Sequence, residues 1–575
     1  MNPSHGEPRL ALDLLYEWEA RSPGRVVFTQ PMADGSLRDL SWRDLMHETR
    51  RIAAHLRDRN FPGGSRIAIL SKNCVHWLMS DFAIWMAGHV SVPLYPTLSA
   101  GTIRQILEHS EARLLFVGKL DGWEAMSAGV PPGLACITYP LSPPTPYDTW
   151  DEIVRDTAPL QGCPMRDAAE LATIIYTSGT TGMPKGVMHS FGALAWALHT
   201  GMRRLSLSPE DRVLSYLPLA HIVERTLVEQ GLLATGMHVY FVRSLDTFAQ
   251  DLRRARPTAF FSVPRLWAKF QQGVHAKIQP RKLQRMLGTP LLGRFVRRKI
   301  LRTLGLDRCR VAAGGAAPMP TELLQWYARL GLEVLEGYGM TENCGVSHAN
   351  VLGRARPGTV GLPYEGVLAR VDPATGEVQM RSGALMLGYY KEPGLTREAF
   401  TEDGWLHTGD RGEIDADGNL RITGRIKDLF KTSKGKYVAP APIEDRLAAH
   451  PAIEACVVLG AFLPQPIAIA LLGAESLARA APGTPARADL EASLEQHVAR
   501  VNDVADPHER LAQLILTSEP WTVDNGLVTP TLKVRRARVE EVYASELARA
   551  NGAARIVTWA QSRACEAAPP VTARA

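Results

Sequence analysis

The chain has 575 residues, which is too long for one hydrophobic core, so we expect at least two domains. Hydrophobic residues make up 45% and charged residues 22%, which is ordinary for a soluble globular protein. The net charge of +6 suits polyphosphate, anionic lipid or an acidic carrier and is too small to indicate nucleic-acid binding. Seven scattered cysteines without a C-x-x-C pair predict reduced thiols and argue against a zinc site.

The first 160 residues alternate between helical and strand patterns. Residues 41–57 form an amphipathic pattern that Ser41 can cap, so we predict a helix there. Strands are predicted at 66–70 and 114–117, and a largely apolar helix at 77–87. Alternating strands and helices predict a mostly parallel sheet covered by helices. The N-terminus lacks the apolar core of a signal peptide, so we expect a cytoplasmic protein.

A second run of alternating strands and helices is predicted for 170–350. Short strands replace the helical period over 360–424, and a mixed segment follows that contains strands. The apolar stretch 457–474 contains Pro464 and Pro466, which would break a membrane-spanning helix. We predict two strands joined by a Pro-Gln-Pro turn instead, and no integral membrane span.

Residues 176–186 read Y-T-S-G-T-T-G-M-P-K-G and follow the apolar run 171–175. A buried strand that opens into a loop of glycines and hydroxyls with one lysine is suited to a phosphate tail. The Walker pattern requires Gly-Lys-Ser/Thr, whereas Lys185 lies between a proline and a glycine. The loop therefore does not indicate a kinase or GTPase of the Walker type.

Further motifs follow in order along the chain. Residues 312–318 read A-A-G-G-A-A-P, residues 335–342 read L-E-G-Y-G-M-T-E, and residues 405–410 read W-L-H-T-G-D. Nearer the C-terminus, residues 432–440 read T-S-K-G-K-Y-V-A-P and residues 526–536 read G-L-V-T-P-T-L-K-V-R-R. Each motif alone could be a turn or a surface charge.

Together these strings resemble the acyl-adenylate-forming superfamily of acyl-CoA synthetases, luciferases and peptide-synthetase adenylation domains. The resemblance implies an α/β plus α+β fold. Residues 1–424 would form a large N-terminal domain of two α/β subdomains and a strand-rich subdomain, which carries the ATP and acyl sites. Residues 425–427 would form a hinge, and 428–575 a small mobile α+β domain with a catalytic lysine and a thioesterification loop.

The resemblance also assigns roles in binding ATP and Mg²⁺. Tyr338 would stack on adenine, Thr341 would contact the α-phosphate, and Asp410 and Arg425 would bind the ribose. Mg²⁺ prefers one or two carboxylates plus phosphate oxygens, and Glu342 and Thr181 would hold it. The residues expected to bind ATP or AMP are Thr177, Ser178, Gly179, Thr180, Thr181, Lys185, Gly315, Ala316, Glu336, Gly337, Tyr338, Gly339, Thr341, Asp410 and Arg425.

The catalytic residues implied by the resemblance are Lys533, Thr341, Glu342 and His221. Lys533 matches the superfamily's lysine near the C-terminus, although Leu532 stands where most members have glycine. Lys427 would be the hinge about which the small domain swings. The CoA loop would consist of Lys434, Gly435 and Lys436, with Gly435 letting the pantetheine arm pass close to the backbone.

Four strings point to the long-chain fatty acyl-CoA synthetase branch. They are residues 214–225, 259–267, 81–96 and 434–440, the first of which reads L-S-Y-L-P-L-A-H-I-V-E-R. His221 in that string would lie near the acyl carboxylate, or it is a buried structural histidine. The expected substrates are a fatty acid, ATP and CoA, with Mg²⁺ as cofactor. Chain length stays open, and aromatic or bile-type acids are not excluded.

A basic segment at 281–310 carries ten Lys or Arg and a single acidic residue, Asp307. Within it, 291–302 is amphipathic and could lie on an anionic membrane surface, at the inner face of the membrane. A solvated helix face or a docking site for an acidic carrier fits the same pattern.

Two other functions compete with an acyl-CoA synthetase. The acyl group could pass to a carrier protein or another nucleophile, or the chain could be a non-catalytic sensor of nucleotide or lipid. The presence of Lys185, Glu342, Asp410, Arg425 and Lys533 argues against the sensor. The sequence leaves the oligomeric state open, a dimer included.

Overall fold

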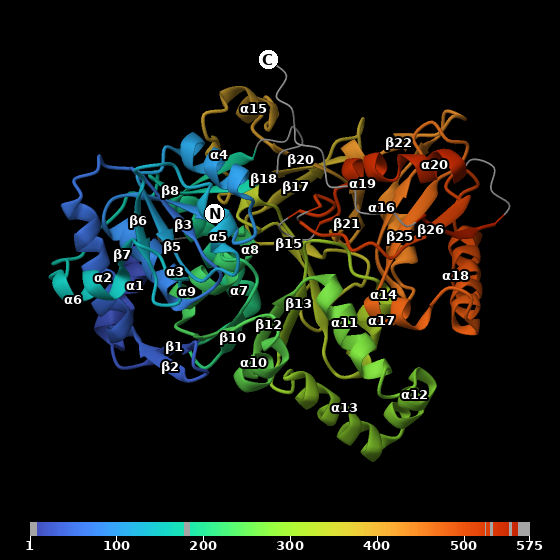
Figure 1. Ribbon diagram of the computed structural model, residues 1–575, viewed down its shortest axis with the longest axis horizontal. Coiled ribbons are helices and arrows are strands. Elements are labelled where there is room, and N and C mark those ends of the chain that lie inside the picture. Colours follow the sequence, from blue (N-terminus) through green and yellow to red (C-terminus); the bar gives the residue numbers. More distant parts are fainter. Residues whose placement is uncertain (1–8, 178–183, 524, 530–532, 551–554, 562–575) are drawn as a thin grey trace. The chain divides into compact units, whose positions relative to one another are not determined.

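The computed structural model describes residues 9–561 except 178–183, 524, 530–532 and 551–554. The chain divides into two compact units, Met1–Ile422 and Thr423–Ala575 (Figure 1). The division falls inside strand β21 (Leu420–Arg425). The predicted hinge residue, Lys427, therefore lies within the second unit, in the 3₁₀ turn Ile426–Asp428.

An eight-stranded sheet forms the centre of the first unit, in the order β19-β9-β8-β4-β3-β5-β6-β7. The strands from β8 to β7 are parallel, and β9 runs antiparallel to both β8 and β19. Every residue of β4 and β5 is buried, as expected for a parallel sheet covered on both faces. The bounds are β3 (Arg66–Leu70), β4 (Val90–Leu94), β5 (Leu114–Val117), β6 (Ala135–Thr138), β7 (Asp148–Thr149), β8 (Leu171–Thr177), β9 (Lys185–Ser190) and β19 (Gly388–Tyr389).

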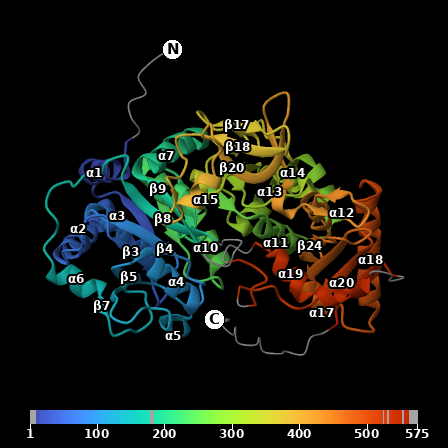
Figure 2. The same cartoon turned by 90° about the horizontal axis from the view of Figure 1, so that it is seen from above.

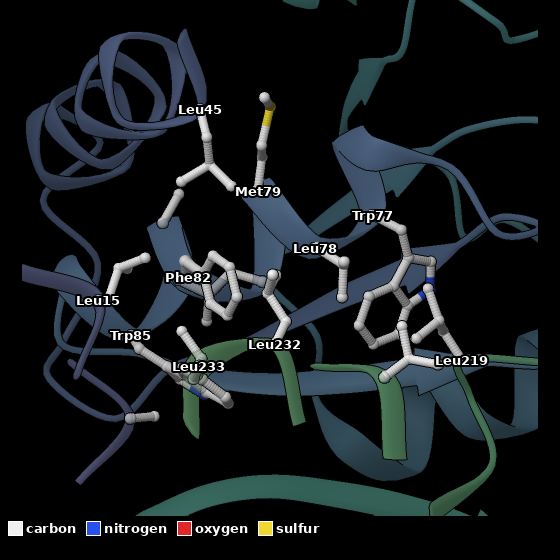
Figure 3. Close-up of a cluster of buried hydrophobic side chains, with 14 of the residues drawn as sticks. Leu15, Leu45, Trp77, Leu78, Met79, Phe82, Trp85, Leu219, Leu232 and Leu233 are labelled. Atoms are coloured by element: carbon white, nitrogen blue, oxygen red, sulfur yellow. The ribbon is translucent and has the colours of Figure 1, made fainter. Parts of the chain in front are cut away.

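Helices cover this sheet, and their buried side chains form a hydrophobic core together with those of the strands. Helix α2 begins after Ser41, whose hydroxyl accepts the Asp44 N–H as predicted, while Asp44 caps the Ser41 N–H in return. Helix α3 is buried along its whole length. Figure 3 shows Leu78, Phe82 and Trp85 of α3 packed with Leu232 and Leu233 of α9. The bounds are α1 (Ala11–Arg21), α2 (Trp42–Asp58), α3 (Val75–Met86), α4 (Ala100–Ser110), α5 (Trp123–Ser127), α6 (Trp150–Asp156), α7 (Phe191–Leu205), α8 (Ile222–Glu224) and α9 (Gly231–Thr235).

The two predicted runs of strands do not form separate sheets. Strands β8 and β9, from the second run, join the sheet of the first 160 residues, and β1 and β2, from the first run, pair into the sheet β10-β11-β1-β2. Hydrophobic periodicity identifies a strand but carries no information on its lateral partner, which explains the difference. The bounds are β1 (Val26–Pro31), β2 (Leu37–Ser41), β10 (Arg212–Ser215) and β11 (His238–Phe241).

A five-stranded sheet, β12-β13-β14-β15-β16, supports the second half of this unit. Strands β12, β13 and β14 are parallel, so their carboxyl ends lie at one edge. The bounds are β12 (Ala259–Ser262), β13 (Val311–Gly314), β14 (Val334–Tyr338), β15 (His348–Ala349), β16 (Leu362–Pro363), α10 (Phe248–Ala255), α11 (Pro264–His275), α12 (Pro280–Gly288), α13 (Pro290–Leu304) and α14 (Thr321–Arg329).

The strand-rich region predicted at 360–424 is a four-stranded sheet in the order β17-β18-β20-β21. A short helix, α15 (Pro393–Glu398), interrupts it, which the turn-rich sequence did not indicate. Pro393 stands at the start of this helix, where a missing N–H costs no hydrogen bond. The other bounds are β17 (Leu368–Val371), β18 (Glu377–Arg381) and β20 (Leu406–Ile414).

The second unit is built on the sheet β24-β25-β26-β27, with α18 alongside it in both views (Figures 1 and 2). Strands β24 and β25 are the antiparallel pair predicted within 457–474. In the described part of the chain no helix is long and apolar enough to cross a membrane. The bounds are β22 (Phe430–Lys431), β23 (Tyr437–Val438), α16 (Pro440–Leu447), β24 (Ile453–Leu459), β25 (Ile467–Leu472), α17 (Ala474–Arg479), α18 (Pro485–Asp503), β26 (Gln513–Thr517), α19 (Arg536–Val542), α20 (Ala544–Ala550) and β27 (Val557–Trp559).

The core around α3 makes a direct prediction about stability. Leu78 is 0% exposed and Leu245 is 79% exposed, so the same truncation tests burial alone. Leu78→Ala should destabilise the first unit by about 2–5 kcal/mol, because it removes buried methyl groups and leaves a cavity. Leu245→Ala should stay within about 0.5 kcal/mol of the wild type. Urea unfolding followed by circular dichroism measures both, and equal shifts would contradict this description of the core.

Candidate active site

The predicted phosphate loop joins β8 to β9 in an antiparallel hairpin. Thr177 ends β8 and pairs in register with Lys185, which opens β9. Ser178, Gly179, Thr180 and Thr181 lie outside the described residues. The hairpin register therefore places the two described members of the loop, Thr177 and Lys185, opposite each other.

Tyr389 lies between two of the predicted functional residues. Its hydroxyl donates a hydrogen bond to Glu342 Oε1 at 2.9 Å, and Lys185 Nζ lies 5.3 Å from the centroid of its ring. Burial, followed by the neighbouring Glu342 carboxylate, raises the pKa of Tyr389, so the hydroxyl keeps its proton and remains a donor. Sequence reasoning missed Tyr389; the available signal was its place in the Gly-Tyr-Tyr string at 388–390.

The glycines after β13 and within β14 allow two chain segments to come close together. A Cβ on Gly315 would lie 2.9 Å from the carbonyl oxygen of Gly337, so a side chain there would collide with backbone. Ala316 has a φ of 68°, which a non-glycine residue rarely adopts. Glu336 Oε2 accepts the Gly358 N–H at 3.2 Å. The structure thus brings Gly315, Glu336 and Gly337 close together at the ends of β13 and β14.

Tyr338 and Asp410, predicted to contact adenine and ribose, touch each other. The Tyr338 hydroxyl donates to Asp410 Oδ2 at 2.5 Å, and Asp410 is buried on β20. The Asp410 N–H donates to Thr408 Oγ1 at 3.1 Å. A tyrosine of β14 and a carboxylate of β20, which are far apart in sequence, are therefore in direct contact within the first unit.

A short 3₁₀ turn, Thr341–Asn343, carries the predicted phosphate and metal residues Thr341 and Glu342. The turn is closed by Asn343 Oδ1, which accepts the Met340 N–H at 2.9 Å. Its far end is held by Thr226, whose hydroxyl donates to the Cys344 carbonyl at 2.9 Å. Thr226 belongs to the π-helix η1 (Arg225–Gln230), a rare element that is frequent at functional sites.

Arg225 anchors that π-helix by a buried ion cluster. Its guanidinium pairs with Asp81 and with Glu229 (Nε to Oε2, 3.0 Å) and donates to Thr173 Oγ1 at 2.7 Å. The side chains of Arg225, Asp81 and Glu229 are fully buried. Burial raises the pKa of Glu229 well above its usual range, and the nearby Arg225 guanidinium opposes this shift.

Glu224 and His221 occupy the turn before the π-helix. Glu224 Oε1 accepts from Ser215 Oγ at 2.8 Å, from the Tyr216 N–H at 3.1 Å and from Asn73 Nδ2 at 3.2 Å. His221 Nδ1 accepts the Val223 N–H at 3.2 Å, so the ring caps the helix that follows. This cap leaves the Nε2 nitrogen as the proton carrier of a neutral ring. The ring is half-buried, and both the role near the acyl carboxylate and the structural role stay predictions.

The remaining predicted residues belong to the second unit. Arg425 ends β21 and Lys427 is exposed in the following turn. Lys434, Gly435 and Lys436 form the tip of the β22–β23 hairpin, where the Thr432 N–H donates to the Lys436 carbonyl at 2.8 Å and Gly435 has a φ of 77°.

Lys533 is exposed, and its N–H donates a hydrogen bond to Thr529 Oγ1 at 3.1 Å. The helix after Lys533 is fixed by a charge-assisted fork. Arg536 donates to Glu444 Oε1 at 2.7 Å and to Oε2 at 3.0 Å, which ties the start of α19 to α16. Lys533 thus stands on a short segment whose base is held rigidly.

The donor chemistry fits magnesium bound together with phosphate. Among the described residues there is no group of three or more His, Cys, Asp or Glu side chains that could hold a metal alone. Mg²⁺ usually takes one or two carboxylates and completes its shell with substrate phosphates and water. The Glu342 carboxylate, oriented by the Tyr389 hydroxyl, offers one such ligand.

Family models match both units of the chain. Residues 15–390 match the AMP-binding enzyme model, and residues 427–554 match the AMP-binding enzyme C-terminal domain model. The chain therefore belongs to the AMP-binding enzyme family, which confirms the resemblance seen in its motifs.

Curated relatives and solved structures agree with this assignment. The long-chain-fatty-acid–CoA ligase FadD15 of Mycobacterium bovis is 32% identical, over 94% of this chain and 97% of its own. Long chain acyl-CoA synthetase 4 of Arabidopsis thaliana is 30% identical, over 86% of this chain and 84% of its own.

Two solved structures show the fold. One is the anthranilate CoA ligase AuaEII in complex with anthranoyl-AMP, with a TM-score of 0.77, 21% identity and coverage of 95% of this chain and 99% of that one. The other is the A domain of carboxylic acid reductase from Segniliparus rugosus. Its TM-score is 0.79 and its sequence identity 22%, and the match covers 95% of this chain and 94% of that one. These matches confirm the predicted combination of a large α/β domain and a smaller C-terminal domain.

Glu224 makes a prediction about stability and pH. Burial raises its pKa to about 8 from an ordinary 4.5, so the folded state binds a proton that the unfolded state releases between these values. This contribution to stability is complete below pH 4.5 and disappears as the pH rises through 8. Glu224→Gln cannot release a proton, so its melting temperature relative to wild type should rise by about 2 °C or more from pH 5 to 8.5.

The matched control is Glu210→Gln, which changes an exposed carboxylate. Its melting temperature relative to wild type should stay level across the same pH range. If the difference in melting temperature between Glu224→Gln and wild type also stayed constant across this pH range, Glu224 would be ionised in the folded protein.

Proposed function

We propose that the protein activates a long-chain fatty acid with ATP to an acyl-adenylate and transfers the acyl group to CoA, releasing pyrophosphate and AMP. Two sets of contacts in the first unit carry the proposal: Tyr389 joins Lys185 to Glu342, and Tyr338 donates a hydrogen bond to Asp410. This set offers a cation, an aromatic face and two carboxylates, which are the groups that a magnesium nucleotide requires.

The first half-reaction joins a carboxylate to the α-phosphorus of ATP. The two reactants repel each other, and the transition state adds negative charge to the phosphorus oxygens, so the site must position them and neutralise that charge. We assign the orientation of adenine to Tyr338, the ribose to Asp410 and Arg425, the phosphates to Lys185 and the loop 177–181, and the α-phosphate to Thr341. Mg²⁺ held at Glu342 and Thr181 would supply further neutralisation.

Lys533 is the proposed catalytic cation of this step. It would bridge the substrate carboxylate and the α-phosphate, a position that attracts both reactants and stabilises the charge that develops between them. In the second half-reaction the CoA thiol attacks the acyl carbon, and AMP leaves with the bridging oxygen. Lys533 and the loop of Lys434, Gly435 and Lys436 share the second unit, so a rotation at Lys427 would exchange one for the other between the half-reactions.

The relatives support a fatty acid and CoA as the substrates. The two relatives described above, at 32% and 30% identity, are named as a long-chain-fatty-acid–CoA ligase and a long chain acyl-CoA synthetase. The string at 214–225 leads from β10 into the π-helix, and Thr226, the residue that follows it, donates to the Cys344 carbonyl beside the turn of Thr341 and Glu342. CoA is therefore favoured over a carrier protein as the acceptor.

The experiment is to measure pyrophosphate and AMP from ATP and Mg²⁺ across fatty acids of increasing length, with and without CoA. AMP accumulation that requires both a long acid and CoA supports the proposal. Pyrophosphate release with acid alone that CoA does not change would move the acceptor to another nucleophile. Absence of turnover with any acid would favour a non-catalytic chain.

Lys533→Ala separates the two half-reactions. Loss of one preorganised cation costs about 3 kcal/mol in the transition state, so adenylation should fall by about 150-fold. Thioester formation from supplied acyl-adenylate should change by less than about threefold, because Lys533 has no role in that step. Lys269→Ala, which removes an exposed lysine of α11, serves as the control. Equal loss in both half-reactions would contradict the assignment.

Tyr389→Phe tests the orientation of Glu342. The variant removes one hydrogen bond to a carboxylate and keeps the ring near Lys185, so we expect Mg–ATP to bind about fivefold more weakly, corresponding to about 1 kcal/mol. Tyr390→Phe is the matched control, since it removes the neighbouring hydroxyl from the same strand end. Calorimetric titration of Mg–ATP measures both, and equal affinities for the two variants would mean that Tyr389 does not orient the site.

A further inference from the structure

Three large apolar side chains stand exposed on the first turns of α13. Leu291 is 86% exposed, Leu292 44% and Phe295 64%. We call them the apolar triad. Isolated exposed apolar residues are common, but three within five positions on one helix require an explanation. The triad lies directly after the turn between α12 and α13, at the margin of the first unit (Figure 1).

The helix that carries the triad is firmly packed. Val296 and Ile300, on the opposite face of α13, are buried in one hydrophobic cluster together with Leu283 of α12. Gly293 is also buried, and a Cβ there would lie 2.6 Å from the Leu287 carbonyl oxygen, so α13 lies close against the end of α12. Both helices therefore satisfy their core contacts without the triad, which remains on the outside of a fixed scaffold.

Basic residues flank the triad in the sequence. Residues 281–302 contain eight Lys or Arg and no Asp or Glu. Within the described residues, all eight are exposed and none forms an ion pair, so their charge is not neutralised by a neighbour. The eight residues are Arg281, Lys282, Arg285, Arg294, Arg297, Arg298, Lys299 and Arg302.

The spacing places charge and apolar surface on one face of α13. Residues three or four apart are neighbours on a helix. Leu291 and Phe295 therefore lie on the same face of α13 as Arg298, Lys299 and Arg302. Long basic side chains can lay their apolar stems beside such residues and direct their charged ends toward phosphate groups. The face thus combines an apolar end with a cationic border, the pattern of helices that lie at a lipid interface.

We propose that α12 and α13 dock this protein on an anionic lipid bilayer, with the apolar triad entering the interface and the basic border contacting lipid phosphates. A bilayer accepts convex apolar side chains without a shaped pocket, whereas an acidic protein partner would have to provide a complementary groove. The basic side chains that precede and follow the triad in sequence also suit a uniformly anionic plane. Docking would bring the proposed ligase to the membrane in which a long-chain fatty acid dissolves.

Vesicle flotation tests the proposal on the full chain without ATP, acid or CoA, so the result does not depend on the ligase activity. We expect at least tenfold stronger binding to phosphatidylcholine vesicles with 30% phosphatidylglycerol than to phosphatidylcholine alone, and loss of most of this difference in 0.5 M salt. Equal binding to both vesicles, or none to either, would overturn the proposal. Capture of an acidic carrier protein without vesicle binding would assign the surface to a protein partner instead.

Matched variants locate the surface. Replacing Leu291, Leu292 and Phe295 by Gln should weaken binding to anionic vesicles at least tenfold, and Leu245→Gln, equally exposed elsewhere, should leave it unchanged. Replacing Arg294, Arg298 and Lys299 by Gln should have a similar effect. The control with the same loss of charge replaces the exposed Arg43, Arg113 and Arg381. Thermal unfolding checks that each variant is folded, and equal losses in variants and controls would overturn the proposal.

Insertion distinguishes entry into the lipid from a purely electrostatic contact. Phe295→Cys, in a Cys163→Ser and Cys565→Ser background, is labelled with an environment-sensitive dye. A blue shift on anionic vesicles, together with quenching by brominated acyl chains, is expected. An unshifted emission from bound protein would contradict entry of the apolar triad.

Discussion

The site of the first unit depends on one buried guanidinium. Arg225 joins Asp81 of α3, Thr173 of β8 and Glu229 of its own π-helix, so a helix, the central sheet and an irregular helix meet at one charge. Removing Arg225 would leave two buried carboxyls without their cation, a loss of about 3–5 kcal/mol. The next residue, Thr226, holds the Cys344 carbonyl and with it the turn of Thr341 and Glu342.

This arrangement explains why the candidate residues collect where they do. In open sheets of parallel strands, ligands bind beyond the carboxyl ends of the strands. Thr177 stands at the carboxyl end of β8, Gly315 follows β13, and Tyr338 ends β14. Backbone turns at these ends require glycine where two segments approach, and the polar side chains that follow are placed by strand geometry. The π-helix that contains Arg225 also holds the turn of Thr341 and Glu342, through the hydrogen bond from Thr226 to the Cys344 carbonyl.

The sequence predicted local features well because local physics determines them. Strands β3 and β5 have the predicted bounds, and Ser41 caps α2. What it missed depends on contacts between distant residues. Tyr389 reaches Glu342 only because β19 pairs with β9, and the strand order of the central sheet mixes both predicted runs. The roles proposed for the site residues, from Lys185 and Tyr338 to Lys533 and the CoA loop, rest on resemblance and stay predictions.

Isotope transfer tests the central claim most directly. A long-chain fatty acid labelled with ¹⁸O in both carboxylate oxygens is turned over with ATP, Mg²⁺ and CoA, and the nucleotide product is analysed by mass spectrometry. In an acyl-adenylate one carboxylate oxygen bridges carbon and the α-phosphorus, and thiol attack breaks the bond to carbon, so the account predicts AMP that carries one ¹⁸O atom. Label in inorganic phosphate with ADP as the nucleotide, or unlabelled AMP, would contradict it.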